Sequence, residues 1–213
     1  MHHSLLLFDK PVGFSSFQIV RVLKKHFDKV GHAGTLDPFA SGLLIILVGR
    51  ATKQFENIQR MEKEYVGEIV LGITTDTYDI TGMITEQHNF VKENFNLSTL
   101  NPIVERFVGE IEQTPPRYSA LKHRGRKLYQ MSRKNLPIEI TPRRVFVKSF
   151  RITDIDLPIL CFESTVGRGV YIRSLAHDLG KATGCGATLL SLRRTRIGEY
   201  DLTQAEKLGS FLS

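Results

Sequence analysis

The sequence has little cysteine, no tryptophan and no long hydrophobic run. Its 213 residues include two cysteines, Cys161 and Cys185, which form no CxxC metal motif. Two cysteines cannot make a disulfide scaffold, so we expect a reducing, cytoplasmic compartment. No apolar stretch approaches the roughly 18 residues of a membrane-spanning helix, and residues 5–8 are too short for a signal-peptide core. The composition therefore predicts a soluble protein without a membrane segment.

Acidic residues are also in the minority. The chain has 22 acidic and 29 basic side chains, a formal net charge of +7 and a pI near 9.5. This balance favours a polyanionic partner without identifying one. Apolar residues make up 41% of the chain, which is enough to bury a sizeable core. His2 and His3, whether native or a tag remnant, are a poor metal site without further ligands, and we assign them no role.

Strand and helix patterns alternate along the chain. Strands are expected at residues 4–8, 43–48, 64–73, 145–155 and 159–166. Helices are expected after a capping box of Ser15 and Gln18, after a cap at Ser98 up to Gly109, from Ile172 to Thr183 with Gly184 as the stop, and after a capping box of Thr203 and Glu206. The interspersed order predicts a mixed α+β fold. Because no repeat or clear linker divides the sequence, we expect one domain over residues 1–213.

Two of these elements carry more specific expectations. In the first helix, Phe17, Val20, Leu23 and Phe27 are near helical spacing and are expected to form its apolar stripe. In the strand at 64–73, the alternation places Tyr65 on the same face as Ile69, at the exposed end of the strand. Both expectations concern side-chain burial.

The block from Gly31 to Leu44 places one carboxylate, Asp37, in a glycine-bounded loop. Asp37 followed by Pro38 could also be a helix N-cap with proline at the first helical position. The next segment argues against a helix, because residues 43–48 are a short apolar run between glycines, as in a buried strand. The loop would then bring Asp37 to a sheet edge. His32 in the same block has an alternative as a turn or core residue.

One segment, residues 113–144, concentrates basic side chains and contains a single acidic residue, Glu139. Tyr118 and Tyr129 lie among these charges, a mixture suited to phosphate neutralisation and base stacking. A solvated surface hairpin or helix is the alternative. We expect the segment to contact nucleic acid.

Several sequence blocks occur in the order found in a known family. They are Lys10-Pro11-Val12-Gly13, the 31–44 block, Lys63-Glu64-Tyr65 ahead of Leu71-Gly72, Thr75-Asp76-Thr77 with Asp79 and Gly82, residues 115–122, Tyr171-Ile172-Arg173 with Asp178-Leu179-Gly180, and Leu192-Arg193-Arg194-Thr195 with Gly198. With these blocks the chain resembles the bacterial tRNA pseudouridine-55 synthases over nearly its whole length. It departs at Val170, where the family usually has threonine, and it stops soon after Leu208, where many members continue.

The resemblance implies a fold, an activity and a substrate. The fold is the pseudouridine synthase fold, a central, mostly antiparallel mixed sheet flanked by helices, with residues 113–144 as an RNA-gripping insertion and no C-terminal PUA-type domain. The activity is isomerisation of uridine to pseudouridine in the T-loop of tRNA, after the base is flipped out of the RNA. No metal or other cofactor is needed, the partner is the T-arm of tRNA, and we expect a monomer.

The resemblance also implies catalytic residues. Asp37 would act at the sugar or base, by covalent addition or by triggering elimination, and both routes stay open. Arg173 would hold this carboxylate ionised in a pocket that excludes water. Tyr65 would stack on the uracil with its hydroxyl near C5. The alternatives are a surface position for Arg173 at a helix start and a core position for Tyr65.

The remaining residues implied by the resemblance contact the substrate. His32 would brace the space left by the flipped uridine, and Leu192 would confine the detached base, although Leu192 also fits an ordinary core. Further substrate contacts are expected from Lys10, Tyr171 and Lys122, and RNA backbone contacts from Arg124, Arg126 and Lys127.

Two other functions are considered. The first is a non-catalytic tRNA-binding or tRNA-folding protein. The second is a hydrolase with Asp37 and His32 as an acid–base pair, but no serine or cysteine nucleophile motif accompanies them.

Overall fold

The computed structural model describes residues 4–119, 121–123, 126–132 and 140–207. By its internal contacts the chain forms two compact units. Unit 1 comprises Met1–Val66, Thr165–Arg168 and Leu192–Ser213, and unit 2 comprises Gly67–Ser164 and Gly169–Ser191. The strands β4 (Lys63–Leu71) and β12 (Ala187–Ile197) each contribute residues to both units. That the chain folds as one domain stays a prediction.

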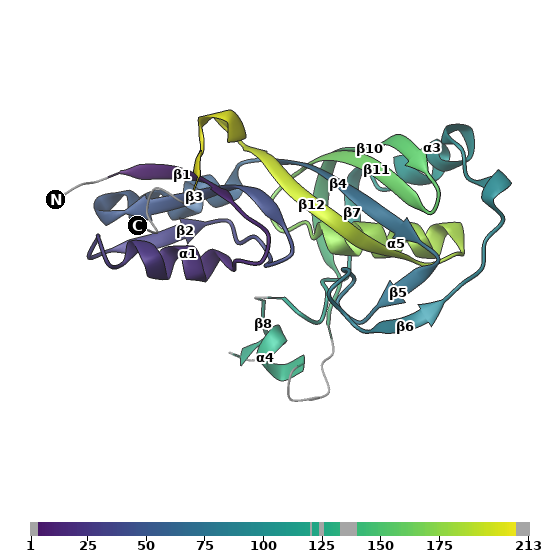
Figure 1. The fold of residues 1–213 in the computed structure, drawn as a ribbon, viewed down its shortest axis with the longest axis horizontal. Coiled ribbons are helices and arrows are strands. Elements are labelled where there is room, and N and C mark those ends of the chain that lie inside the picture. The colour runs from purple at the N-terminus through teal and green to yellow at the C-terminus, as the bar shows by residue number, and fades with distance from the viewer. Residues whose placement is uncertain (1–3, 120, 124–125, 133–139, 208–213) are drawn as a thin grey trace. The chain divides into compact units, whose positions relative to one another are not determined.

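Unit 1 is built around β3 (Ser41–Val48), which pairs with three other strands (Figure 1). The antiparallel partners are β1 (Leu5–Lys10) and β2 (Val30–Ala33), and β12 runs parallel to β3. Shorter elements complete the unit: α1 (Ser16–Leu23), the 3-10 helix η1 (Gly49–Gln54), α2 (Phe55–Arg60), β13 (Tyr200–Asp201), the 3-10 helix η3 (Leu202–Gln204) and β14 (Glu206–Lys207).

The core of unit 1 lies on both faces of β3. Successive residues of a strand point to opposite faces, so alternate residues of β3 enter two different clusters. Leu44, Ile46 and Val48 pack with Phe8 and with the buried side of α1. Leu43, Ile45 and Leu47 pack on the other face with α2 and the end of β12. The uninterrupted apolar run at 43–48 is therefore a strand buried on both faces, as its sequence predicts.

Unit 2 contains a sheet with the strand order β12-β4-β11-β10-β7. Its further strands are β7 (Gly109–Gln113), β10 (Arg143–Asp156) and β11 (Ile159–Val166). The helix α3 (Leu97–Glu105) packs on β10 and also contacts α5 (Ile172–Thr183). The other elements are the hairpin β5 (Ile73–Thr75) and β6 (Ile84–Gln87), the 3-10 helix η2 (Lys92–Asn94), the pair β8 (Lys122–His123) and β9 (Arg126–Lys127), and α4 (Leu128–Ser132).

Most elements confirm the sequence-based expectations. The capping box of Ser15 and Gln18 opens α1, and α5 spans the expected residues and ends at Gly184, whose φ of 76° is the left-handed conformation typical of a helix stop. The sheets contain parallel and antiparallel pairs, and the fold is α+β. No helix among the described residues is long and apolar enough to cross a membrane.

Two predicted caps are wrong. The cap of α3 is Asn96, whose side chain accepts a hydrogen bond from the N–H of Thr99 (3.1 Å), while the Ser98 hydroxyl donates to Asn96. Near the C-terminus, Asp201 rather than Thr203 caps a short 3-10 turn, and Glu206 belongs to a strand. In both places a nearby side chain with a carbonyl or carboxylate oxygen accepts from the free N–H groups in place of the hydroxyl.

The strand predicted at 64–73 ends earlier than expected. Gly72 has a φ of 89°, a conformation that interrupts an extended strand, and Ile73 begins β5. Tyr65 was expected at the exposed end of this strand, but it is only 9% exposed.

Candidate active site

The loop at residues 34–40, here the Asp37 loop, is fixed by the segment that begins α1. The buried hydroxyl of Ser16 donates to the carbonyl of Leu36 (2.9 Å) and accepts from the N–H of the same residue (2.8 Å). On the other side of Asp37, the N–H of Gly13 donates to the carbonyl of Pro38 (2.7 Å). The loop leads into β3, so the alternative of a helix capped by Asp37 is wrong.

Arg194 of β12 holds the same loop from another side. It is 1% exposed, and its guanidinium donates to the carbonyls of Leu43 (2.8 Å) and Gly34 (2.9 Å) and, at 3.5 Å, of Thr35. Gly42 lies directly against its backbone, where a Cβ would be 2.7 Å from the Arg194 nitrogen. Sequence reasoning gave Arg194 no role; the only signal was its place in the Leu192–Thr195 block.

Lys10 is a buried cation near Asp37. It ends β1, is 0% exposed, and its ammonium donates to the carbonyls of Pro11 (2.9 Å) and Phe14 (2.6 Å). Burial lowers the pKa of Lys10 to about 8; the Asp37 charge acts to raise it, and Arg194 acts to lower it. These contacts give Lys10 a role in holding the turn, and its expected contact with substrate stays a prediction.

His32, Tyr65 and Leu192 also belong to unit 1, as does Asp37. Burial and, secondarily, the charge of Arg194 lower the pKa of His32, so its imidazole is neutral at neutral pH. Its Nδ1 is buried and has no hydrogen-bond partner among the described residues. Tyr65 and Leu192 are each 9% exposed. Their burial fits both an apolar wall of a site and an ordinary core.

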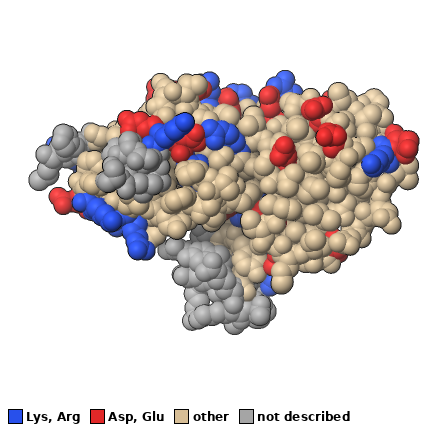
Figure 2. All heavy atoms as spheres, viewed as in Figure 1, with Lys and Arg blue, Asp and Glu red and all other residues tan. Residues whose placement is uncertain are grey.

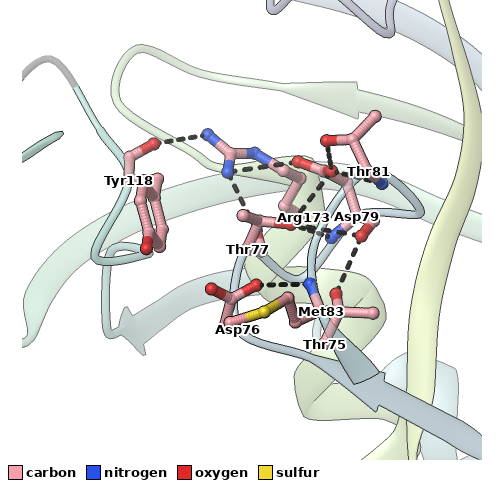
Figure 3. A network of polar contacts seen from close by, with 8 residues as sticks. All are labelled: Thr75, Asp76, Thr77, Asp79, Thr81, Met83, Tyr118 and Arg173. Atoms are coloured by element: carbon pink, nitrogen blue, oxygen red, sulfur yellow. Dashed lines mark hydrogen bonds and ion pairs between the residues drawn. The ribbon is translucent and has the colours of Figure 1, made fainter. Parts of the chain in front are cut away.

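Arg173 lies in the first turn of α5 and is 5% exposed, so the surface alternative is wrong. Its guanidinium donates to the carbonyls of Thr77 and Tyr118, both at 2.9 Å. Its Nη1 is also 3.4 Å from a carboxylate oxygen of Asp79, as Figure 3 shows. These three contacts within unit 2 fix the orientation of the guanidinium plane.

Asp79 is a functional candidate that sequence reasoning left without a role. It is 4% exposed, and its other carboxylate oxygen accepts from the Thr77 hydroxyl (3.0 Å) and from the N–H (3.0 Å) and hydroxyl (2.5 Å) of Thr81. Figure 3 shows these donors grouped around the carboxylate. The sequence signal is the run of threonines around it, because short hydroxyl side chains are typical partners of a buried carboxylate in a tight loop.

The residue before Asp79 is strained and stacked. Tyr78 has a φ of 63°, which is uncommon for a side chain other than glycine. Its ring stacks on His177 of α5, with centroids 3.7 Å apart and an interplanar angle of 10°. Burial lowers the pKa of His177 to about 4. The stack ties the Asp79 loop to the helix that carries Arg173.

The other expected site residues are placed less completely. The backbone of Tyr171 is held on both sides by the buried side chain of Gln113, which accepts from its N–H (2.8 Å) and donates to its carbonyl (3.1 Å). Lys122 lies in β8, and Arg126 and Lys127 form β9. Arg124 lies outside the described residues. The expected pair of Asp37 and Arg173 joins a residue of unit 1 to one of unit 2, and it stays a prediction.

No group of three or more histidine, cysteine, aspartate or glutamate side chains suited to a metal ion occurs among the residues that the structure describes. Each unit contributes a carboxylate, a buried cation and an aromatic side chain: Asp37, Lys10 and Tyr65 in unit 1, and Asp79, Arg173 and Tyr78 in unit 2. Such a set is suited to nucleophilic or acid–base chemistry.

The sequence matches known families over nearly its whole length. The model of the TruB family pseudouridylate synthase N-terminal domain matches residues 21–172, and that of the tRNA pseudouridylate synthase B C-terminal domain matches residues 173–212. The chain belongs to the TruB family. Its relatives include the tRNA pseudouridine synthase B of Flavobacterium johnsoniae, 44% identical over 94% of this chain and 91% of the relative. That of Endomicrobium trichonymphae is 41% identical over 94% of this chain and 87% of the relative.

Solved structures of similar fold include chains that are longer than this one. A chain of the archaeal box H/ACA sRNP Nop10-Cbf5 complex has a TM-score of 0.71 and 28% identity, over 99% of this chain and 53% of that one. A chain of a Cbf5-Nop10-Gar1 complex has a TM-score of 0.72 and 30% identity, over 96% of this chain and 52% of that one. The expected pseudouridine synthase fold and the expected membership of the bacterial tRNA pseudouridine synthase family, here named TruB, are confirmed.

Proposed function

We propose that this chain is a tRNA pseudouridine synthase that isomerises the T-loop uridine conventionally numbered 55. The observation that carries the proposal is the fixation of the Asp37 loop in a chain of the TruB family. Ser16, Gly13 and Arg194 hold the backbone on both sides of Asp37. A carboxylate on a loop held in this way is already oriented before substrate arrives, which lowers the entropic part of the barrier.

The reaction breaks the bond from uracil N1 to the ribose C1′ and forms a bond from C5 to C1′ after the base has turned. Asp37 either adds to the substrate or triggers elimination at the sugar, and its carboxylate must be ionised in both cases. The buried ammonium of Lys10 is an opposite charge near it, since Asp37 acts to raise the pKa of Lys10. Arg173 pairs with Asp37 in the assembled site, and Asp79 orients Arg173.

The remaining side chains receive the base and the RNA. Tyr65 stacks on the uracil near C5, and Leu192 forms an apolar wall that retains the base after the glycosidic bond breaks. The neutral His32 imidazole occupies the space that the flipped uridine leaves, where it stacks and forms hydrogen bonds. Lys10 and Tyr171 complete the substrate contacts.

The T-arm is held chiefly by charge. Lys122, Arg124, Arg126 and Lys127 neutralise backbone phosphates, which contributes affinity more than sequence choice. The protein acts on tRNA as a monomer. Alanine at Arg124, Arg126 and Lys127 would weaken tRNA binding and flatten its salt dependence, because fewer counterions are released.

The test maps pseudouridine in a tRNA transcript after incubation with the purified chain. The proposal expects one modified residue, at position 55, and none in a transcript whose residue 55 is cytidine. Modification elsewhere would contradict the assigned position. Tight tRNA binding without any pseudouridine would favour the alternative, a tRNA-binding or tRNA-folding protein.

A further inference from the structure

The solvent face of α1 combines an exposed aromatic ring with basic side chains. The helix buries Ser16, Ile19, Val20 and Leu23. Phe17 was expected in this apolar stripe, but it is 62% exposed. Four residues fill the side of this short helix that faces the core. Phe17 lies on the opposite, solvent-exposed side. The ring of Phe17 therefore adds little to the core and is accessible to a binding partner.

The same face is strongly basic. Arg21 lies on α1, and Lys24 and Lys25 follow directly after it; all three are exposed. No acidic residue occurs between residues 10 and 27. Within the described part of the chain, these three side chains form no ion pair. In Figure 2, blue side chains gather at the lower left, over α1 as it lies in Figure 1.

The face begins at the Asp37 loop. Ser16, which binds Leu36 next to Asp37, is the neighbour of Phe17 in the first turn of α1. Arg21 lies one turn farther along the helix, about 6 Å from Phe17 along the axis, and Lys24 about 10 Å. Positions four and three residues apart share one side of a helix. The three side chains thus form a row that leads away from the candidate catalytic loop.

We propose that this row, together with the adjacent Lys25, is an RNA-binding strip, in which Phe17 stacks on an unpaired nucleobase next to the target uridine and Arg21, Lys24 and Lys25 bind phosphates. The inference rests on the proposed function, because the RNA strand that carries the target nucleotide must pass beside the Asp37 loop. Unpaired loop bases are the usual partners of exposed aromatic rings in RNA recognition. Adjacent guanidinium and ammonium groups fit the charged backbone that follows. The strip belongs to unit 1, whereas the basic segment at 113–144 belongs to unit 2.

Two sets of variants of the full chain separate the parts of the strip. The first is Arg21→Gln with Lys24→Gln and Lys25→Gln, and the second is Phe17→Ala, with Phe17→Leu as the variant that keeps an apolar side chain. The matched control is Lys92→Gln with Arg106→Gln and Lys181→Gln, which removes three exposed basic side chains from unit 2. Binding of a tRNA transcript is measured over a range of salt concentrations, and kcat and KM by tritium release from uracil C5. Circular dichroism checks that each variant is folded.

The triple variant of the strip should bind tRNA at least about tenfold more weakly than wild type. The slope of log Kd against log salt should fall by about 2, because three phosphate contacts are lost. Phe17→Ala should raise KM about fivefold or more with little change in kcat, and Phe17→Leu should fall between it and wild type.

Wild-type Kd and slope in the triple variant, or an equal loss in the control triple, would overturn the inference. If wild type is inactive but the triple variant still binds RNA more weakly than wild type, the proposed isomerase is rejected and the RNA-binding strip is not. The two failures are thus distinguishable.

Discussion

The hydroxyl of Ser16 is hydrogen-bonded to both the N–H and the carbonyl of Leu36, the residue before Asp37. Twenty positions separate the two residues in the sequence. One buried side chain at the start of α1 therefore sets the backbone from which the candidate catalytic carboxylate extends. The backbone geometry of the Asp37 loop thus depends on α1 as well as on the loop itself.

Replacing Ser16 with alanine should reduce catalysis more than substrate binding. The Leu36 N–H and carbonyl would lose their buried partner, which costs about 1–3 kcal/mol of stability. The carboxylate would be less well oriented, so kcat should fall at least about tenfold while KM changes little. Steady-state kinetics and urea unfolding measure the two effects. The neighbouring Ser15→Ala removes the helix cap instead, so it should lower stability by about 1 kcal/mol with near-normal kcat; equal kcat values for the two variants would contradict the account.

Replacing Asp79 with asparagine should disturb Arg173. The side chain keeps its size, but the carboxylate that accompanies the buried guanidinium is lost. Hydrogen bonds to charged groups contribute about 1.5–3 kcal/mol, so a stability loss of this size is expected, together with a reduced kcat. Thr81→Val is the control, because it removes one donor to Asp79 and keeps the charge. A wild-type kcat in Asp79→Asn would show that Arg173 needs no orientation by Asp79.

His177 should make the protein acid-sensitive. A histidine in the unfolded chain takes up its proton near pH 6.5, whereas the pKa of folded His177 is about 4. Between these values the unfolded state binds more protons, so stability falls as the pH drops from 6.5 to 4, by up to about 3 kcal/mol. His177→Phe keeps a ring against Tyr78 and removes this dependence. The comparison is denaturant unfolding of wild type, His177→Phe and the exposed-site control His26→Phe at pH 7 and pH 4.5; parallel losses in all three would refute the prediction.

Lys10 should make folding stability depend on pH in the alkaline range as well. Its pKa in the folded chain is about 8, below the ordinary value of 10.5, so the unfolded state binds more protons between these values. Wild type should therefore gain up to about 3 kcal/mol relative to Lys10→Met as the pH rises from 8 to 10.5. Relative to the exposed-site variant Lys53→Met, which retains Lys10, wild type should show no such gain. A constant difference between wild type and Lys10→Met across that range would mean that the buried ammonium is not destabilised by its surroundings.

The sequence predicts correctly those helices and strands whose characteristic pattern lies within one continuous segment. The strand at 43–48 is one example, because burial on both faces requires consecutive apolar residues. The helix at 172–183 is another, because a glycine in the left-handed conformation ends it. The caps at Asn96 and Asp201 were missed because several competent side chains stand within a few positions, and only the folded backbone decides which one accepts.

Contacts between distant segments were beyond sequence reasoning. Asp79 and Arg173 are nearly a hundred positions apart, and the sequence pattern of neither segment predicts their contact. The complete burial of Lys10 and the exposure of Phe17 also depend on which side of each element faces the core. Asp37 could be proposed as a site residue because its loop is distinctive in sequence. The side chains that hold the loop, Ser16 and Arg194, lie in segments without such a distinctive pattern.

The most direct test of the central claim compares wild type with Asp37→Asn. Tritium release from a tRNA transcript labelled at uracil C5 reports the loss of the C5 hydrogen, and a filter-binding assay reports tRNA affinity. The account predicts release by wild type and none by Asp37→Asn, with the Kd of the two proteins within a few-fold of each other. Release by Asp37→Asn at a rate near that of wild type would contradict it.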